Sequence, residues 1–271
     1  MLTKIFNVFA LVITMLCAST VYAGDLEDGY AAFAKKNYAV AMAYFKKAAA
    51  QGDAYAQYNL GFLYEKGQGV VQDYAEAVKL YRLAAAQGLA SAHYNLGLMY
   101  SNGEGVVQDY AEAAKWYRLA AAQGLALAQN NLGAMYKNGQ GVVQDYAEAV
   151  KWWKLAAAQG HANAQYNLGL MYKNGQGVVQ DYAEAVKWYK LAAAQGLASA
   201  HYNLGLMYAN GQGVVQDYVR AHMWWNLAAV KGDADAVKNR DIVAAKMTTQ
   251  QIAQAQKLAR ECQARDYKNC D

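Results

Sequence analysis

The sequence is poor in the residues that carry out chemistry at enzyme and metal sites. It holds four histidines and three cysteines in 271 residues. It contains neither a His-Glu-x-x-His motif nor a serine-lysine pair at Ser-x-x-Lys spacing. Cys262 and Cys270 have no histidine near them in the sequence that could complete a tetrahedral zinc set. We therefore expect no catalytic residues, no metal site and no cofactor, and we expect that the protein is not an enzyme.

An excess of charge of one sign is also missing. The formal net charge is +4, from 25 Lys and Arg against 21 Asp and Glu. No stripe of Lys and Arg interleaves with aromatic residues as a nucleic-acid surface requires. We therefore expect no nucleic-acid partner.

A long apolar run occurs only at the start of the chain. Lys4 precedes the mostly apolar segment Ile5–Leu16, and Val21-Tyr22-Ala23 has the small residues at −3 and −1 of a signal-peptidase site. These features predict a signal peptide over residues 1–23 and an exported chain, periplasmic or secreted. The alternative, a buried first helix, has no counterpart in the rest of the sequence. After residue 23 no segment approaches the ~20 apolar residues needed to span a bilayer.

Export bears on the two remaining cysteines. In an oxidising compartment, Cys262 and Cys270 could join the last helix to the C-terminal tail by a disulfide. The alternative is two free thiols on a frayed end.

What the sequence does contain is a repeat of 36 residues. NGQGVVQDYAEAVKW occurs at Asn138–Trp152 and again at Asn174–Trp188. The string Gly-x-Gly-Val-Val-Gln-Asp-Tyr recurs five times, with its aspartate at Asp73, Asp109, Asp145, Asp181 and Asp217. A fixed period of this size indicates stacked supersecondary units, each unable to bury its apolar face alone. It favours binding over catalysis.

One repeat, Asp53–Gly88, shows the expected local structure. Ala56, Leu60 and Leu63 share a face at helical spacing, which predicts a first helix. Gly61 interrupts this helix at a cost of about 1 kcal/mol relative to alanine. Its equivalents are Gly97, Gly133, Gly169 and Gly205. We infer that the paired helix packs closely against this glycine. A second helix from Tyr74 is expected to end at Gly88, in the left-handed conformation common there.

The loop between the two helices has two further features. Its glycines supply backbone angles that other residues resist, and we expect Val70 and Val71 to turn inward and seal the gap between neighbouring repeats. A phosphate-binding interpretation of Gly-x-Gly is disfavoured, because neither a Gly-Lys-Ser/Thr motif nor a preceding strand accompanies it.

Paired acids begin each second helix. Asp73 and Glu76 have the spacing of a capping box, in which each side chain bonds the backbone N–H of the other residue. The pair recurs at Asp109/Glu112, Asp145/Glu148 and Asp181/Glu184, and Arg220 replaces the glutamate in the last repeat. Two carboxylates could also form a glycosidase site. Their repetition at helix starts favours the structural interpretation.

The bulky residues of the second helices recur as pairs, which we interpret as core rather than as a ligand cage. The pairs are Leu80/Tyr81, Trp116/Tyr117, Trp152/Trp153, Trp188/Tyr189 and Trp224/Trp225.

These residues resemble the Sel1-like repeat family of the tetratricopeptide-repeat-like superfamily. The signature is Ala-x-x-x-Leu-Gly-x-x-Tyr, then Gly-x-Gly-Val-x-x-Asp, then Ala-x-x-Tyr-x-x-Ala-Ala and a closing glycine. The resemblance implies an all-α fold, a right-handed α-solenoid of stacked helix-turn-helix repeats. It divides the chain into a short unit over residues 24–52, five repeats over 53–232, and a closing helix pair with a tail over 233–271. We expect Thr248 to cap the last helix, with Gln251 at the third position.

The resemblance also implies that the first helices line a concave surface that binds proteins or peptides. The partner-binding residues expected there are Tyr55, Tyr58, Phe62, Tyr94, Leu98, Asn130, Tyr166, Leu170, Tyr202 and Leu206. Tyrosine combines apolar area with a hydrogen-bonding tip, as interfaces favour. The alternative is drift at exposed positions. The asparagines shared by every repeat, among them Asn59 and Asn203, either bond nearby backbone or clamp a peptide.

The function that follows is an exported bacterial scaffold or adaptor with a protein or peptide partner. One alternative is a secreted, host-directed virulence factor. Another is an enzyme like those of the cysteine-rich Sel1 branch associated with β-lactam binding or hydrolysis. The repeats of that branch each carry a cysteine pair, whereas the repeats here carry none.

Overall fold

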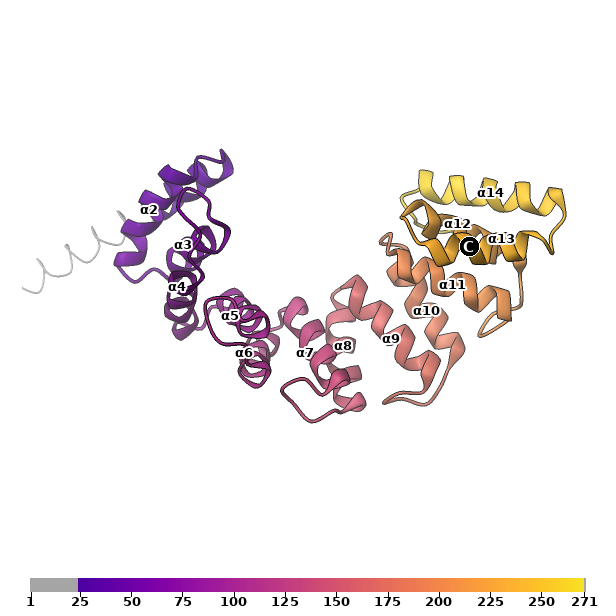
Figure 1. Cartoon of the computed structure of the whole chain (residues 1–271), viewed down its shortest axis with the longest axis horizontal. Helices are drawn as coiled ribbons and strands as arrows, with labels where there is room; N and C mark the ends of the chain where they lie inside the picture. The colour runs from indigo at the N-terminus through magenta and orange to yellow at the C-terminus, as the bar shows by residue number, and fades with distance from the viewer. Residues whose placement is uncertain (1–23, 271) are drawn as a thin grey trace, which may run out of the picture. The chain divides into compact units, whose positions relative to one another are not determined.

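The computed structural model describes residues 24–270, and every regular element in that range is a helix (Figure 1). Residues 24–34 are helical. The helices that follow are α2 Tyr38–Ala50, α3 Ala54–Lys66, α4 Tyr74–Ala86, α5 Ala90–Asn102, α6 Tyr110–Ala122, α7 Ala126–Asn138, α8 Tyr146–Ala158, α9 Ala162–Asn174, α10 Tyr182–Ala193, α11 Ala198–Asn210, α12 Tyr218–Val230, α13 Ala234–Ala244 and α14 Thr249–Ala264. The expected signal peptide, residues 1–23, lies outside the described residues.

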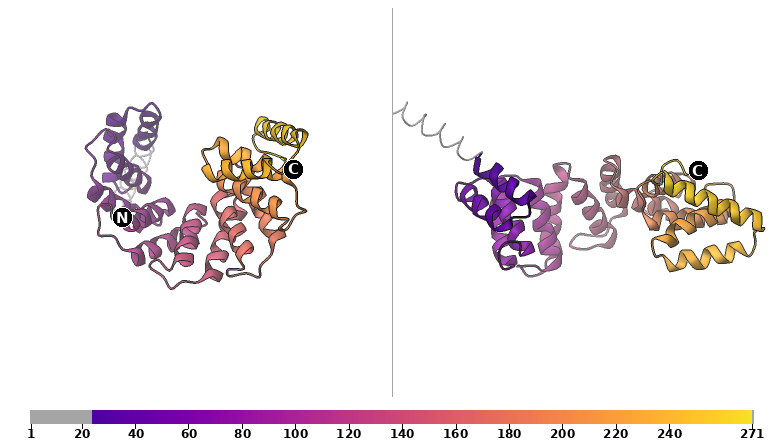
Figure 2. Two further views of the ribbon diagram at one scale, coloured as in Figure 1. Left: turned by 45° about the vertical axis from the view of Figure 1, so that its right-hand side comes forward. Right: turned by 90° about the horizontal axis from the view of Figure 1, so that it is seen from above.

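The helices pack in series as helix-turn-helix pairs within two compact units. The N-terminal unit extends to Gln123, and the C-terminal unit begins at Gly124. In the N-terminal unit α3 packs against α4, and α5 against α6. In the C-terminal unit the pairs are α7 with α8, α9 with α10, and α11 with α12 (Figure 2). The predicted class, an all-α solenoid of helix pairs, is confirmed.

The closing helices depart from this pairing. Both α13 and α14 pack against α12. A disulfide joins Cys262 of α14 to Cys270 of the tail. Between residues 24 and 270, no helix has the length and apolar character needed to cross a membrane.

Each second helix begins at its aspartate, although not through the reciprocal box that the sequence predicts. The Asp73 carboxylate accepts the backbone N–H of Glu76 at 3.0 Å. Glu76 does not return the bond but pairs with Lys79 at 3.2 Å. The reason is that the Asp73 N–H already donates to the carbonyl of Tyr64, at 3.0 Å. The complete box forms at Thr248 and Gln251, as predicted.

The helical glycines lie under the aromatic rings of the paired helix. A Cβ atom added at Gly133 would lie 2.7 Å from the indole nitrogen of Trp153, and one added at Gly61 would lie 3.0 Å from the ring of Tyr81. Tyr117, Tyr189 and Trp225 cover Gly97, Gly169 and Gly205 in the same way. The predicted close packing is confirmed, and the group that approaches is a side-chain ring.

The two loop valines have different environments, which corrects the expectation that both turn inward. Val70 packs against the core cluster of Phe45 and Leu63, and Val106 packs likewise one repeat later. Val71 is 86% exposed, and Val107 is 88% exposed. Only the first valine of each loop therefore contributes to the seal between neighbouring repeats.

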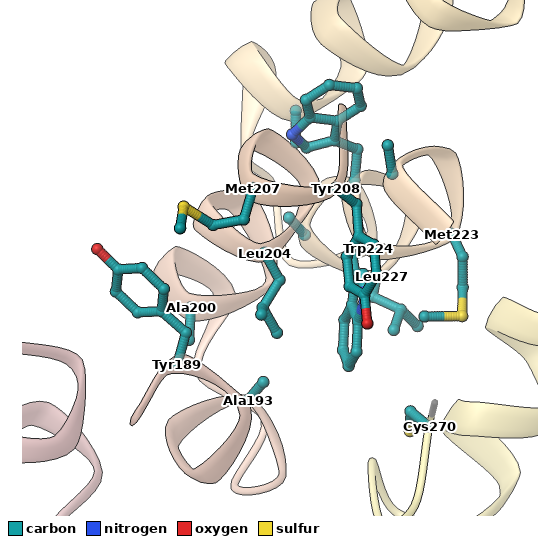
Figure 3. Close-up of a cluster of buried hydrophobic side chains, with 14 of the residues drawn as sticks. Tyr189, Ala193, Ala200, Leu204, Met207, Tyr208, Met223, Trp224, Leu227 and Cys270 are labelled. Atoms are coloured by element: carbon teal, nitrogen blue, oxygen red, sulfur yellow. The ribbon is translucent and has the colours of Figure 1, made fainter. Parts of the chain in front are cut away.

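The core is a series of small clusters, each shared between neighbouring helices. The largest lies in the C-terminal unit, where Leu204 and Met207 of α11 meet Trp224 and Leu227 of α12 (Figure 3). Of the predicted aromatic pairs, the second member is buried in every repeat, whereas Trp116, Trp152 and Trp188 are half-buried.

Gly133→Val tests the packing of glycine against the aromatic ring. The larger side chain must displace the ring of Trp153, so we expect a loss of about 1–3 kcal/mol in unfolding free energy and a lower Tm. Ala158→Val, at an exposed position of α8, is the control for adding a β-branched residue to a helix. Equal melting temperatures for the two variants, measured by circular dichroism, would contradict the packing argument.

Candidate functional site

Three tyrosines of the predicted partner-binding set, Tyr58, Tyr94 and Tyr166, pack against core rings of their own repeats. The ring of Tyr58 lies 5.5 Å from that of Tyr81, and Tyr94 lies 5.8 Å from Tyr117. In the C-terminal unit Tyr166 lies 5.8 Å from Tyr189. These partners are the rings that cover the helical glycines. One face of each tyrosine ring is therefore committed to packing, and the side chains are half-buried.

The tyrosine hydroxyls bond asparagines of the next repeat. The Asn203 side-chain amide donates to Tyr166 Oη at 3.4 Å, and the Asn239 amide donates to Tyr202 Oη at 3.2 Å. Burial raises the pKa of Tyr58, and a hydrogen bond with the side chain of Asn95 offsets part of this rise. These hydroxyls are therefore part of a ladder that links neighbouring repeats.

The shared asparagines also bond backbone, as one of the two interpretations of the sequence predicts. Asn59 donates to the carbonyl of Tyr55 at 2.7 Å, and Asn203 donates to that of Ser199 at 2.9 Å. In the repeat where Asn130 replaces tyrosine, its side-chain oxygen accepts from Asn167 at 3.4 Å. Asn130 thus preserves the link without an aromatic ring.

The other predicted site residues are more accessible. Tyr55 is 55% exposed, and Phe62, Leu98, Leu170 and Leu206 are half-buried along the first helices. The structure places Tyr55, Tyr58, Phe62, Tyr94 and Leu98 in the N-terminal unit, and Asn130, Tyr166, Leu170, Tyr202 and Leu206 in the C-terminal unit. Partner binding by these residues stays a prediction.

Two of them line grooves between successive first helices. Leu206 lines a cavity of about 300 Å³ between α11 and α13, together with Trp225, Ile242 and Lys246. Leu98 lines a cavity of about 180 Å³ between α3 and α5, at the same register of the repeat. The repeat therefore builds the same groove in each of the two units.

The two grooves differ in charge. Glu65, Lys66 and Glu104 line the groove of the N-terminal unit, where Glu65 pairs with Lys66 at 2.5 Å and accepts from Tyr81 Oη at 2.6 Å. Lys246 is the charged residue among those that line the groove of the C-terminal unit. Each groove therefore suits a different side chain of a partner.

Sequence reasoning missed a second ladder, in which the acceptor glutamines are buried. Gln87 donates its side-chain amide to Gln57 Oε1 at 2.9 Å, and Gln195 donates to Gln165 Oε1 at 2.8 Å. The acceptors lie on first helices and the donors at the ends of second helices. The recurrence of Ala-Ala-Ala-Gln-Gly is the signal that could have revealed the donors.

His201 is the exception in this ladder, because Lys231 replaces the glutamine that would reach it. The imidazole is fully buried, and its Nε2 bonds the carbonyl of Ala193 at 3.0 Å. Its Nδ1 has no hydrogen-bond partner. Burial, with a smaller contribution from the charge of Lys231, lowers the pKa of His201 to about 4. The ring therefore stays neutral at physiological pH.

The paired acids at the starts of the second helices make structural contacts. The paired acids cap helices and bind lysines, as described for Asp73 and Glu76. Within residues 24–270 no three His, Cys, Asp or Glu residues gather as a metal would require.

The stacked pairs, the inter-repeat ladders and the grooves define a helical repeat protein. The Sel1 repeat profile matches residues 23–53, 54–89, 90–125, 126–161, 162–197 and 198–233. The chain belongs to the Sel1 repeat family.

Two solved structures show the same fold. A protective antigen of uropathogenic Escherichia coli strains with an SLR fold is 35% identical, with a TM-score of 0.81 over 95% of this chain and 56% of that one. This chain thus spans little more than half of that protein. A Sel1 repeat protein from Oxalobacter formigenes is 37% identical, with a TM-score of 0.75 over 79% of this chain and 88% of that one. No curated protein matches the chain.

His201→Gln tests the buried imidazole. The folded-state pKa of about 4 lies below the unfolded value of 6.5, so the unfolded chain binds more protons between these pH values. We expect stability to fall as pH drops through this window, by at most about 1.4 kcal/mol per pH unit for this group. Gln165 occupies the equivalent position one repeat earlier, and glutamine does not titrate.

The measurement is urea unfolding of the wild type and of His201→Gln at pH 7.5 and pH 4.5. The wild type should lose more stability than the variant. His93, His161 and His222 remain in both proteins, so the difference isolates His201. Identical losses would show that the imidazole is not buried as described.

Proposed function

We propose that this chain is an exported bacterial adaptor that binds a protein or peptide partner on its first-helix faces. Sel1 repeat proteins are generally protein-interaction scaffolds and typically not enzymes. The observation that carries the proposal is the groove between successive first helices, present at one register in both units and lined by Leu98 or Leu206. The tyrosine and asparagine ladder forms a rigid support beside it.

The ladder changes which of the predicted residues we expect to determine specificity for the partner. Tyr58, Tyr166 and Tyr202 can offer a partner only the part of the ring that their packing leaves open. Residues not held by the ladder, such as Tyr55 and Leu206, are better placed to set specificity. The tyrosines then supply apolar area at low entropic cost, because their conformations are already fixed.

The proposal of export rests on the signal peptide predicted over residues 1–23, and a similar protein supports it. The similar E. coli protein is a protective antigen of uropathogenic strains. On the basis of this similarity we propose that the chain reaches the periplasm or the cell surface. The same description favours a host-directed role as the second candidate.

Export has a direct test. The full-length precursor, expressed in a Gram-negative host, should appear in the periplasmic or extracellular fraction. Because Val21-Tyr22-Ala23 has the spacing of a cleavage site, N-terminal sequencing of that material should begin at Gly24. An uncleaved chain in the cytoplasm would overturn this part of the proposal.

Partner binding is tested by two matched sets of substitutions, one on first helices and one on second helices. The first set, Tyr55→Ser with Leu127→Ser, removes exposed apolar side chains from first helices. The second set, Leu83→Ser with Leu155→Ser, removes side chains of comparable exposure from second helices. Crosslinking of intact cells followed by pull-down should recover a partner with the wild type and the second set.

Recovery should fall at least tenfold with the first set, since interface apolar anchors contribute on the order of 1–2 kcal/mol each. Circular dichroism of all three proteins checks that the fold is intact. If the second set loses the partner and the first set retains it, the binding face is made by the second helices instead.

A further inference from the structure

The first helices of the C-terminal unit carry lysines without acidic residues. Helices α7, α9 and α11 contain no Asp or Glu, whereas Lys137 lies on α7 and Lys173 on α9. By contrast, each second helix from α4 to α10 pairs a lysine with a glutamate three residues earlier, as Lys151 pairs with Glu148 at 2.9 Å. In the described part of the chain, neither Lys137 nor Lys173 forms an ion pair with a carboxylate.

In the N-terminal unit, a carboxylate of the chain itself occupies the groove between first helices. Glu65 lines the groove between α3 and α5, and its side chain is only 15% exposed. The carboxylate pairs with the ammonium group of Lys66 and accepts from the hydroxyl of Tyr81. The groove at this register therefore accommodates a carboxylate beside a lysine.

The equivalent groove of the C-terminal unit has no such carboxylate. Ala209 stands at the position equivalent to Glu65, and no Asp or Glu lines the groove between α11 and α13. The cavity there is larger, about 300 Å³ against about 180 Å³. Lys246 lines it, with Nζ 5.7 Å from the centroid of the Tyr218 ring, which also lines it. This groove thus offers room and an ammonium group.

The acidic residues that lie near this groove in the sequence already have partners. Asp241 pairs with Arg240 at 2.9 Å, and Asp217 pairs with Arg220 at 2.6 Å. Neither carboxylate is among the groups that line the cavity. The chain itself therefore supplies no counter-charge to Lys246.

Lys173 brings a second ammonium group against α11. It stands at the position of Glu65 on α9, and its Nζ donates to Asn203 Oδ1 of α11 at 3.4 Å. The Lys173 side chain is half-buried, and burial lowers its pKa. A long hydrogen bond to a neutral amide compensates less for lost hydration than a charged partner does, since charge-assisted bonds are stronger. A carboxylate is the acceptor that best suits this ammonium group.

Apolar side chains of α11 and α13 complete the surface. Leu206 and Ile242 line the cavity, and Ile242 is 51% exposed. Trp225 of α12 lines it as well, and its indole N–H donates to the carbonyl of Tyr202 at 3.2 Å. An apolar side chain that enters here meets groups whose positions are already fixed.

We propose that the partner of this face is an acidic protein segment in which side-chain carboxylates flank an apolar residue. The apolar side chain enters the cavity of Leu206 and Ile242. One carboxylate lies beside Lys246, as Glu65 lies beside a lysine in the N-terminal unit, and another pairs with Lys173. We thereby specify the partner of the adaptor function proposed above, on which this assignment rests.

The test is selection of random peptides, displayed on phage, against the full chain with its disulfide intact. A library avoids dependence on one chosen sequence. We expect the selected peptides to share an apolar residue flanked by Asp or Glu. A selected peptide, blocked at both ends, should bind roughly tenfold more tightly than its version with Gln for Glu and Asn for Asp, as measured by fluorescence anisotropy.

Other outcomes separate this proposal from the adaptor function. If the selected peptides are apolar and no richer in acids than the library, the acidic partner is refuted and the adaptor function stands. If no peptide is selected, the acidic partner is refuted as well. The crosslinking experiment above still decides the adaptor function, because it uses the native partner.

Matched lysine variants test the two ammonium groups. Lys173→Gln with Lys246→Gln should weaken binding of the selected peptide roughly tenfold. Lys151→Gln with Lys187→Gln removes the same charge from second helices and should leave binding unchanged. Equal losses for the two pairs would show a general electrostatic effect and refute the site. Circular dichroism checks the fold, because Lys173 is half-buried.

Two substitutions of one alanine test the place of the carboxylate. Ala209→Glu installs the equivalent of Glu65 in the C-terminal groove, where it should compete with the peptide for Lys246. Ala209→Gln adds a side chain of the same size without charge. We expect the glutamate variant to bind the peptide several-fold more weakly than the glutamine variant. Equal binding by the two variants would overturn the position assigned to the partner's carboxylate.

Discussion

The contact between a helical glycine and an aromatic ring is the interaction on which the rest of each repeat depends. The glycine of the first helix leaves room for one ring from the second, as Gly133 does for Trp153. The ring fixes the distance between the paired helices and fills the space between them. In most repeats its other contact is the tyrosine of the first helix, such as Tyr166 against Tyr189. A residue at the centre of the core thus sets the position of a residue on the candidate binding face.

Two polar ladders then connect one repeat to the next on opposite sides of this core. The asparagine and tyrosine ladder runs along the first helices. In the glutamine ladder, Gln195 bonds Gln165 of its own repeat and the carbonyl of Gly160 in the preceding repeat. Both use groups that would be costly to bury without partners, so a change of register between repeats would break several bonds at once. This requirement leaves few positions free to vary. The grooves vary, since Glu65 and Glu104 line one of them and Lys246 another.

The repeat period was enough to predict the fold class, the helix pairs and the close packing at Gly61, because each depends on residues that recur at a fixed spacing. Features set by competition between partners were not predictable in this way. Glu76 pairs with Lys79 because the amide it was expected to bond is already taken. Val71 faces outward because its neighbour Val70 faces inward. On the candidate face, the positions of the tyrosines followed from the repeat, whereas their hydroxyl bonds involve residues 37 positions away.

Departures from the repeat are concentrated at its C-terminal end, and they have a common physical cause. The repeat that ends with α12 packs against the closing helices α13 and α14 instead of another repeat of the same kind, and the tail is joined to α14 by the disulfide. Lys231 replaces the donor of the glutamine ladder, and its ammonium group lies against the ring of Tyr267 instead. The tail holds Asp266, Tyr267 and Asn269 at positive φ, a conformation that ordinary residues adopt only when their surroundings enforce it. The disulfide and the contacts of Tyr267 supply that enforcement. The tail thereby becomes part of the packing at the end of the array, because Tyr267 contacts the buried ring of His201 and lines a cavity together with Trp224 of α12.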